Sequence, residues 1–193
     1  MSTNVRRRTA ARAAVTATLA ALLLAPAAGA FAAPSDAPAA VRTVAKSPAQ
    51  KGKKGTFVRD VKVAGGWKAK LYKLGGHHYR LDIGDGRRVL GDVEANGRDG
   101  GLDANGVYIV LTPDGRVTSW VGGAHYGAGT YRLPDGSKAK VTRVKRSHAK
   151  MEIISRGHVV AKMDANGRDA GLDANGMYIV LTFDGTFSAH MGR

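Results

Sequence analysis

The chain has 193 residues, with 30 Lys or Arg against 15 Asp or Glu, which gives a formal net charge of +15. It contains no cysteine, which excludes a disulfide framework, a c-type haem attachment and a thiolate metal site. The positive excess favours acidic surfaces or polyanions as partners but does not determine the fold.

The first 33 residues have the composition of a secretory signal peptide. Four arginines, the last of them Arg12, precede an apolar run from Ala13 to Leu24, and Ala30-Phe31-Ala32 supplies a small-x-small cleavage pattern. The run is shorter than the roughly 20 residues of a membrane span. We expect a secreted, extracellular protein without a membrane span. Removal of the four arginines leaves 26 basic residues against 15 acidic ones, a net charge of +11.

Residues 34–55 are rich in Ala, Pro, Ser and Lys, with Val41 and Val44 as their only large apolar side chains. Such a segment buries too little apolar surface to offset its conformational entropy, so we expect a disordered basic arm. The arm is either a solubilising leader or a segment that docks in the acidic cleft of a partner. The basic residues available for docking are Arg42, Lys46, Lys51, Lys53 and Lys54.

The rest of the chain contains one sequence unit twice. Residues 95–112 return almost unchanged as residues 165–182, and a gap-free alignment of residues 67–123 with 137–193 gives 25 identities at 57 positions. Two copies are too few for a solenoid, which needs three or more repeats. We expect a pseudo-symmetric pair of β repeats, residues 56–123 and 124–193.

Apolar residues within each copy alternate with a period of two, which is typical of β strands. Residues 77–83 and 147–153 alternate in this way, and the unbroken apolar runs 107–111 and 177–181 predict central strands covered on both faces. Residues 113–115 and 183–185 are turn signals. In the last strand of each copy the predicted inward residues are Val117, Ser119 and Val121, and Phe187, Ala189 and Met191.

No stretch carries an apolar stripe of helical period between capping residues. The sequence therefore predicts an all-β fold in which two tandem β-meander repeats form a pseudo-symmetric sandwich or paired small barrels.

The duplicated loop is the candidate metal site, because calcium favours several carboxylate and carbonyl oxygens. The EF-hand pattern does not fit, since Arg98 and Arg168 occupy a ligand position and no glutamate closes the loop. The favoured interpretation is turn chemistry, in which Asn-Gly pairs adopt positive φ and Asp99 pairs with Arg98 or caps exposed amides. We expect no metal, and the calcium candidates of the alternative are Asp99, Asp103, Asp169 and Asp173.

Catalytic and cofactor signatures are missing from the sequence. Of the six histidines only His78 and His148 correspond between the copies, and neither copy holds a compact zinc-ligand set. Glu94 and Glu152 are the only glutamates, and there is neither a Gly-x-Ser-x-Gly elbow nor a cysteine nucleophile. No Gly-rich segment joins a strand to a helix as a nucleotide site needs. We expect a protein that is not an enzyme and has no cofactor.

Basic side chains recur at outward strand positions in both copies. Such positions are commonly Lys or Arg, which also protect sheet edges. Their persistence nevertheless suggests a basic face for a polyanion such as teichoic acid, whereas nucleic acid is disfavoured because stacking aromatics are sparse. The face consists of Lys68, Lys70, His78, Arg80, Lys138, Lys140, His148 and Lys150.

Three aromatic residues, Trp67, Tyr72 and Trp120, occur only in the first copy. Ser137, Thr142 and His190 stand at the equivalent positions of the second. Trp and Tyr dominate the energetics of protein interfaces. The asymmetry therefore suggests an aromatic patch in the first repeat that binds a protein.

The leader, the lack of cysteine, the Lys-rich arm and the two β repeats together resemble small secreted actinobacterial proteins, in particular the bridging subunit of umbrella toxin particles. The resemblance lies in architecture, so no residue roles transfer. It implies an adaptor that holds a lectin-bearing, trypsin-like subunit to the spoke repeats of a large toxin chain. It also implies that the segment from Arg42 to Lys54 enters an acidic cleft of a partner.

We therefore expect a secreted, non-enzymatic binding or adaptor protein that docks protein partners in a hetero-oligomeric complex through its arm and its β-repeat surface. One alternative is an extracellular protease inhibitor, with Gly122 to Gly129 or the basic arm as bait. The other is a cell-wall or polyanion-binding module that uses the basic face.

Overall fold

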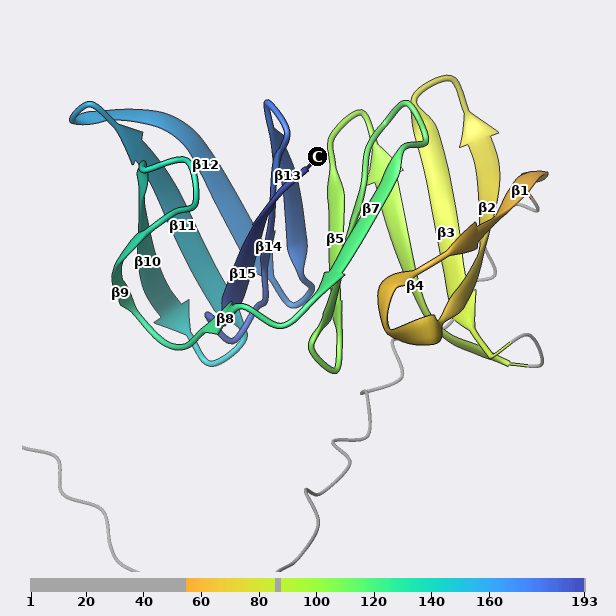
Figure 1. Ribbon diagram of the computed structural model, residues 1–193, viewed down its shortest axis with the longest axis horizontal. Helices are drawn as coiled ribbons and strands as arrows, with labels where there is room; N and C mark the ends of the chain where they lie inside the picture. Colours follow the sequence, from red (N-terminus) through yellow and green to blue (C-terminus); the bar gives the residue numbers. More distant parts are fainter. Residues whose placement is uncertain (1–54, 86–87, 193) are drawn as a thin grey trace, which may run out of the picture. The chain divides into compact units, whose positions relative to one another are not determined.

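The computed structural model describes residues 55–85 and 88–192 (Figure 1). The predicted signal peptide and residues 34–54 of the predicted arm lie outside the described residues. The regular structure of the described part is β strand apart from one 3-10 turn, Ala64–Gly66, so the all-β prediction is confirmed. Among the described residues no helix is long and apolar enough to cross a membrane. Both repeats belong to one compact unit.

The first repeat contributes seven strands. They are β1 (Thr56–Lys62), β2 (Lys68–Gly75), β3 (His78–Gly84), β4 (Val89–Asn96), β5 (Gly100–Ala104), β6 (Val107–Leu111) and β7 (Val117–Val121). The first four form an antiparallel meander in the order β1-β2-β3-β4. Alternation sets which side chains it buries, since Ala69, Leu71, Leu81 and Ile83 lie in the core while the residues between them face outward.

The second repeat follows the same plan. Its strands are β9 (Gly129–Arg132), β10 (Lys138–Lys145), β11 (His148–Ser155), β12 (His158–Asn166), β13 (Ala170–Ala174), β14 (Met177–Leu181) and β15 (Phe187–Met191). β9 to β12 form the second outer sheet in the order β12-β11-β10-β9. A short linker strand, β8 (Ala124–His125), pairs with β15 and so ties the connection to the second repeat.

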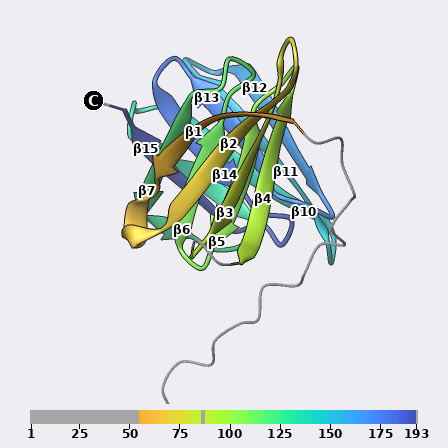
Figure 2. The ribbon, with the colours of Figure 1, turned by 90° about the vertical axis from the view of Figure 1, so that its right-hand side faces the viewer.

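A central seven-stranded sheet, in the order β7-β6-β5-β13-β14-β15-β8, joins the two repeats. The join between β5 and β13 is a single antiparallel pair, Gly100 with Ala170. These residues are equivalent in the two copies, so the repeats meet at their own point of pseudo-symmetry. Each outer sheet covers one face of its own three central strands, and in Figure 2 β1 to β4 lie in front with strands of the second repeat behind.

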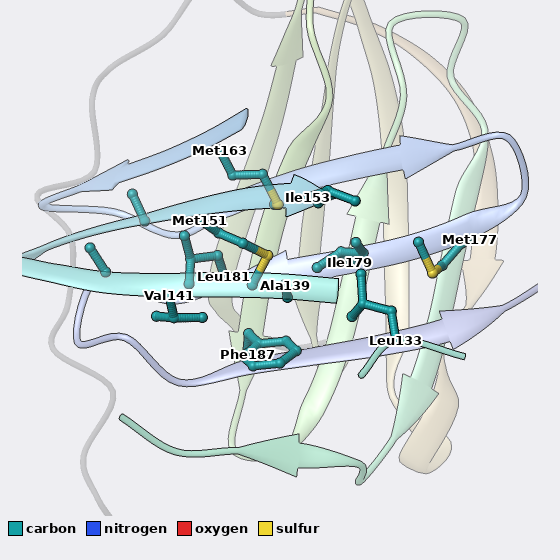
Figure 3. Packing of buried hydrophobic residues seen from close by; sticks show 12 residues of the cluster. Leu133, Ala139, Val141, Met151, Ile153, Met163, Met177, Ile179, Leu181 and Phe187 are labelled. Atoms are coloured by element: carbon teal, nitrogen blue, oxygen red, sulfur yellow. The ribbon is translucent and has the colours of Figure 1, made fainter. Parts of the chain in front are cut away.

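Each repeat has its own core, and the two cores are filled differently. The second core is rich in methionine, with Met151, Met163 and Met177 in the same cluster as Phe187 (Figure 3). The first core has the less flexible Leu81, Val93 and Val107 at the three methionine positions. At two further positions the larger side chain changes repeat. The first repeat has Tyr79 where the second has Ala149, and Val117 where the second has Phe187. Such compensated swaps keep the total volume, which cores tolerate well.

A third cluster lies between the repeats and explains the unbroken apolar runs. Val107, Ile109 and Leu111 face the first core, while Tyr108 and Val110 face the opposite way. There they meet Tyr178 and Val180 of the second repeat, together with Trp120. The prediction that β6 and β14 are covered on both faces is therefore confirmed.

The prediction that every second residue of β7 and β15 faces inward is wrong for the last residue of each strand. Val121 and Met191 are exposed, and the buried residue of β7 is Trp120 on the other face. The reason is that β7 is covered on its second face by the other repeat, which alternation within one strand does not reveal.

Candidate functional site

The duplicated loop supplies turns, as predicted. Asn105 and Gly106 have φ of 57° and 82°, and Asn175 and Gly176 have φ of 54° and 88°. Positive φ at both central residues is the signature of the tight hairpin turn that Asn-Gly favours. These turns connect β5 to β6 and β13 to β14.

The loop also joins the repeats, and glycine is needed where they cross. A Cβ on Gly101 would lie 2.5 Å from backbone atoms of Ala170 and Gly171, and one on Gly171 would lie 2.2 Å from the carbonyl oxygen of Gly100. Real Cβ atoms do not approach backbone so closely. The glycine shared by both copies is therefore a requirement of the junction rather than of a binding loop.

Two equivalent aspartates hold this junction reciprocally. The backbone N–H of Asp173 donates to Oδ2 of Asp99 at 2.7 Å, and the N–H of Asp103 donates to Oδ2 of Asp169 at 2.9 Å. Each carboxylate thus reaches from one repeat into the other. Two roles were predicted for Asp99: an ion pair with Arg98, or capping of exposed amides. The structure shows capping, and the amide, that of Asp173, belongs to the opposite repeat.

The other two aspartates of the loop close their own hairpins. Oδ1 of Asp103 accepts the N–H of Gly106 at 2.7 Å, and Oδ1 of Asp173 accepts that of Gly176 at 2.8 Å. Among the described residues, no group of three or more His, Asp or Glu is arranged to hold a metal ion. The four calcium candidates are thus engaged with backbone amides.

Burial raises the pKa of these carboxyl groups. It raises the pKa of Asp169 to about 6, against the opposing effect of the hydrogen bonds from Asp103 and Phe183, while the charges of Asp103 and Asp184 add to the rise. Burial likewise raises the pKa of Asp99 and of Asp103. A buried anion with anionic neighbours attracts protons and other cations.

A groove of about 1450 Å³ runs between the repeats, along β4 and β5 of the first and β12 and β13 of the second. Its charged lining is mainly acidic, with eight carboxylates against four cations. The carboxylates are Asp82, Asp92, Glu94, Asp99, Asp103, Asp164, Asp169 and Asp184, and the cations are Arg80, Arg98, Lys162 and Arg168. This acidic groove lies on a chain whose net charge is +15.

A separate pocket of about 540 Å³ lies beside the turn after β6. It is lined by Asp99, Asp114 and Asp173, with Arg116 among them. Nη1 of Arg116 is 3.5 Å from Oδ2 of Asp173, and Nη2 donates to Oδ2 of Asp114 at 3.3 Å. Arg116 therefore pairs with two of the three carboxylates of this pocket.

The predicted basic face lies on the outer sheets but carries mixed charge. In the first repeat His78 approaches Glu94 at 3.3 Å and Arg80 pairs with Asp82 at 2.8 Å. Cross-strand register also places Asp82 and Asp92 in the row of Lys70.

The second outer sheet repeats this pattern. Nε2 of His148 lies 2.8 Å from Oδ1 of Asp164, and Lys150 lies 3.7 Å from the same carboxylate. Four members of the predicted basic face form no ion pair with any described residue, namely Lys68, Lys70, Lys138 and Lys140.

The three aromatics of the predicted patch lie in three different environments. Trp67 packs partly buried against the first core, and Tyr72 lies on the outer sheet with Phe57 and Arg80. Trp120 is only 7% exposed, stacks on Tyr108, and donates from Nε1 to Oγ of Ser188 at 2.8 Å. The structure does not bring the three together, and Trp120 joins the repeats.

The predicted bait segment, Gly122 to Gly129, is fixed by strand pairing before Tyr126 and by hydrogen bonds to the carbonyl oxygens of Tyr126 and Gly127. Ala124 and His125 pair with β15, and His125 stacks on Phe187. The Tyr131 hydroxyl donates to the carbonyl oxygens of Tyr126 and Gly127, at 2.7 and 3.2 Å. The Tyr126 side chain itself is 75% exposed.

Sequence reasoning missed the acidic groove and the two tyrosines that face across the repeats. The groove is assembled from edges of both repeats, so no local pattern encodes it. Tyr108 and Tyr178 did have a signal, because each is a polar aromatic inside an apolar run retained in both copies.

Comparison of the chain with protein-family models, with curated proteins and with solved structures gave no match.

Proposed function

We propose that the protein is a secreted, non-enzymatic adaptor that holds two partners at surfaces of opposite charge. The observation that carries this proposal is the acidic groove between the repeats. Its volume of about 1450 Å³ exceeds the roughly 300–1,000 Å³ of typical small-molecule sites. A groove of that size suits a polypeptide segment, and its charge suits a basic one.

The carboxylates on the β4 side of the groove support a cationic occupant. Burial raises the pKa of Asp92, and the negative charges of Asp82 and Glu94 raise it further. Asp92 makes no ion pair with any described residue. The positive charge of a partner would relieve this repulsion, which is the condition for electrostatic recognition.

The second surface of the proposed adaptor is the basic arm, residues 34–55. Its five cations against a single Asp36 suit an acidic cleft of a different partner. Two elements of opposite charge favour two different partners, which is what a bridging subunit requires. The resemblance to the bridging subunit of umbrella toxin particles supports the same role in an extracellular toxin complex.

The proposed function includes no catalysis, because the carboxyl groups whose pKa is raised already accept hydrogen bonds that hold the fold together. The pKa of Asp169 is raised furthest among the carboxyl groups, yet both of its oxygens accept backbone N–H groups, from Asp103 and Phe183. Asp99 is engaged in the same way with Asp173. Oxygens that hold the repeats together are poor candidates for a general acid or base, which must reach a substrate proton.

The proposal is tested by affinity capture from the culture supernatant of the producing organism, with mass spectrometry of the bound proteins. The full chain is compared with an arm variant, in which Arg42, Lys46, Lys51, Lys53 and Lys54 become Gln, and with a groove variant, Asp92→Asn with Asp164→Asn. We expect two partners, each lost with one variant only. Recovery of the same proteins by all three forms would contradict the adaptor.

Inhibition of an extracellular protease is the second candidate, and the segment at Tyr126 favours it. An exposed aromatic side chain on a loop whose carbonyl oxygens are held from below can act as bait for a protease with an apolar specificity pocket. Stoichiometric loss of chymotrypsin activity that disappears in Tyr126→Ala would support it. Unchanged activity across a protease panel would end it.

A further inference from the structure

The junction between the repeats contains one side-chain arrangement twice. Asp114, Asp173 and Tyr178 surround one position, and Asp184, Asp103 and Tyr108 are the residues 70 positions away that surround the other. Asp114 and Asp173 line the 540 Å³ pocket, and all three residues of the second set line the acidic groove. The first set, with Arg116 and Asp99, is called the closed pocket below, and the second, with Asp169, the open pocket.

The closed pocket contains its own cation. The Arg116 guanidinium lies 3.3 Å from Asp114 and 3.5 Å from Asp173, and a hydrogen bond with Tyr178 follows Asp114 among the causes that raise its pKa. The arginine thus engages two carboxylates and a phenol at once. A planar group with five N–H donors suits such an arrangement.

The open pocket has the same walls but a different residue at that position. Thr186 stands where the first repeat has Arg116. No described cation lies within 4 Å of Asp103, Asp169 or Asp184. The closed pocket therefore has its own guanidinium against two carboxylates, whereas no described cation forms an ion pair with the carboxylates of the open pocket and Arg143 acts on Asp184 only from farther away.

Tyr108 provides an independent indication of a ligand. Its side chain is only 1% exposed, yet it lines the groove, and its hydroxyl has no hydrogen-bond partner among the described residues. Its counterpart Tyr178 has Arg116 as a partner. Burial and then the charge of Asp103 raise the pKa of Tyr108, which places that hydroxyl close to the carboxylates. Among the described residues no fully buried side-chain oxygen lacks a hydrogen-bond partner, so this hydroxyl keeps its access to the groove, where an occupant can hydrogen-bond to it.

A metal ion fits this pocket poorly. Asp103 and Asp169 give oxygens to backbone amides, and within the described part of the chain no three acidic or histidine side chains converge as metal ligands. Separated acceptors instead match the fork of donors on a guanidinium.

We propose that the open pocket binds an arginine side chain of a protein partner, which takes the place that Arg116 takes in the first repeat. This inference deepens the proposed function, on which the nature of the partner as a protein rests. The arginine enters the groove over Thr186 and donates to Asp103, Asp184 and the Tyr108 hydroxyl. The first repeat thus contains the bound form of the interaction and the second offers the same contacts to a partner.

The test uses the full chain, isotope-labelled for amide NMR, and an acetylated and amidated Gly-Arg-Gly tripeptide. The peptide should shift the amides of Asp103, Gly106 and Thr186 saturably, and a peptide with citrulline in place of arginine should not. Thr186→Arg should weaken the effect at least about tenfold, because the chain then supplies its own guanidinium. Arg116→Thr should create a second site, seen at the amides of Asp173 and Gly176.

Equal shifts with the citrulline peptide would overturn the proposal, as would undiminished binding by Thr186→Arg. Thermal unfolding of each variant checks that the junction is intact. A change of the open-pocket amides on Arg42→Gln in the absence of peptide would identify the occupant as the chain's own arm and overturn the assignment to a partner. Because the test measures a tripeptide, failure to capture proteins from culture would leave its result unchanged.

Discussion

The two repeats differ least where they touch each other and more in their cores and on their outer sheets. The loop that joins them is almost identical in both copies, and its Gly, Asp and Tyr residues serve the junction. Within that junction, Arg116 pairs with two carboxylates of one pocket, whereas Thr186 leaves the equivalent pocket without an arginine. The two copies thus share the aspartates and tyrosines of the junction, whereas the arginine occurs in one copy only.

The junction glycines give the largest expected effect. Gly171→Ala should lower the free energy of unfolding by about 4 kcal/mol or more, because its Cβ would meet the backbone of Gly100 at 2.2 Å and backbone cannot move aside as a side chain can. Denaturant unfolding measures the change. Gly76→Ala is the control, since a Cβ there meets nothing within 4 Å and should leave stability within about 0.5 kcal/mol. Similar losses for both would remove the steric account of the junction.

Equivalent aspartates should differ in their contribution to the pH dependence of stability. Burial raises the pKa of Asp169 to about 6, above an unfolded value of about 4. The folded state therefore keeps a proton between these values that the unfolded state has released. This contribution is complete below about pH 4 and is lost as the pH rises to about 6, a decrease of about 3 kcal/mol.

Asp169→Asn should abolish most of that decrease in unfolding experiments at different pH values. Asp99→Asn should abolish less, because burial also raises the pKa of Asp99 but the hydrogen bond from Asp173 and the charge of Arg116 oppose the rise. Asp103 and Asp184 face Asp169 and keep their own dependence. Asp184, whose pKa is lowered despite partial burial, acts at lower pH, where stability falls as it becomes protonated. An unaltered pH profile in Asp169→Asn would contradict the assignment.

The two tryptophans should also differ. Trp120→Phe removes the N–H bond to Ser188 and part of a stacked contact between the repeats, so we expect a loss of about 1–2 kcal/mol in denaturant unfolding. Trp67→Phe, at a partly exposed position against one core, should cost less than about 1 kcal/mol. A larger loss of unfolding free energy for Trp67→Phe than for Trp120→Phe would show that the tryptophan more important for stability lies outside the junction.

The smallest effect is expected on the outer sheets. Lys138→Gln with Lys140→Gln should change stability by no more than about 0.5 kcal/mol, because these lysines are exposed and unpaired within the described part. The pair should also leave capture of the partners unchanged. Loss of a partner, together with a steep dependence of its binding on salt, would revive the polyanion alternative.

Local patterns were sufficient to predict the strands and turns but not the junction. Period-two alternation identified the buried Leu71, Leu81 and Met151, and the Asn-Gly pairs identified the hairpins, because both depend on neighbours in sequence. The burial of Trp120 depends on the opposite repeat, more than 60 residues away, and so does the role of Asp99. The acidic groove could not be predicted for the same reason.

We expect the arginine peptide to bind in whichever repeat lacks an arginine at the position of Arg116 and Thr186. In the double variant Arg116→Thr with Thr186→Arg, NMR titration with the Gly-Arg-Gly peptide should shift the amides of Asp173 and Gly176 and no longer those of Asp103 and Gly106. Shifts that remain at Asp103 and Gly106 in the double variant would contradict the account, because binding would then not depend on which repeat supplies its own arginine.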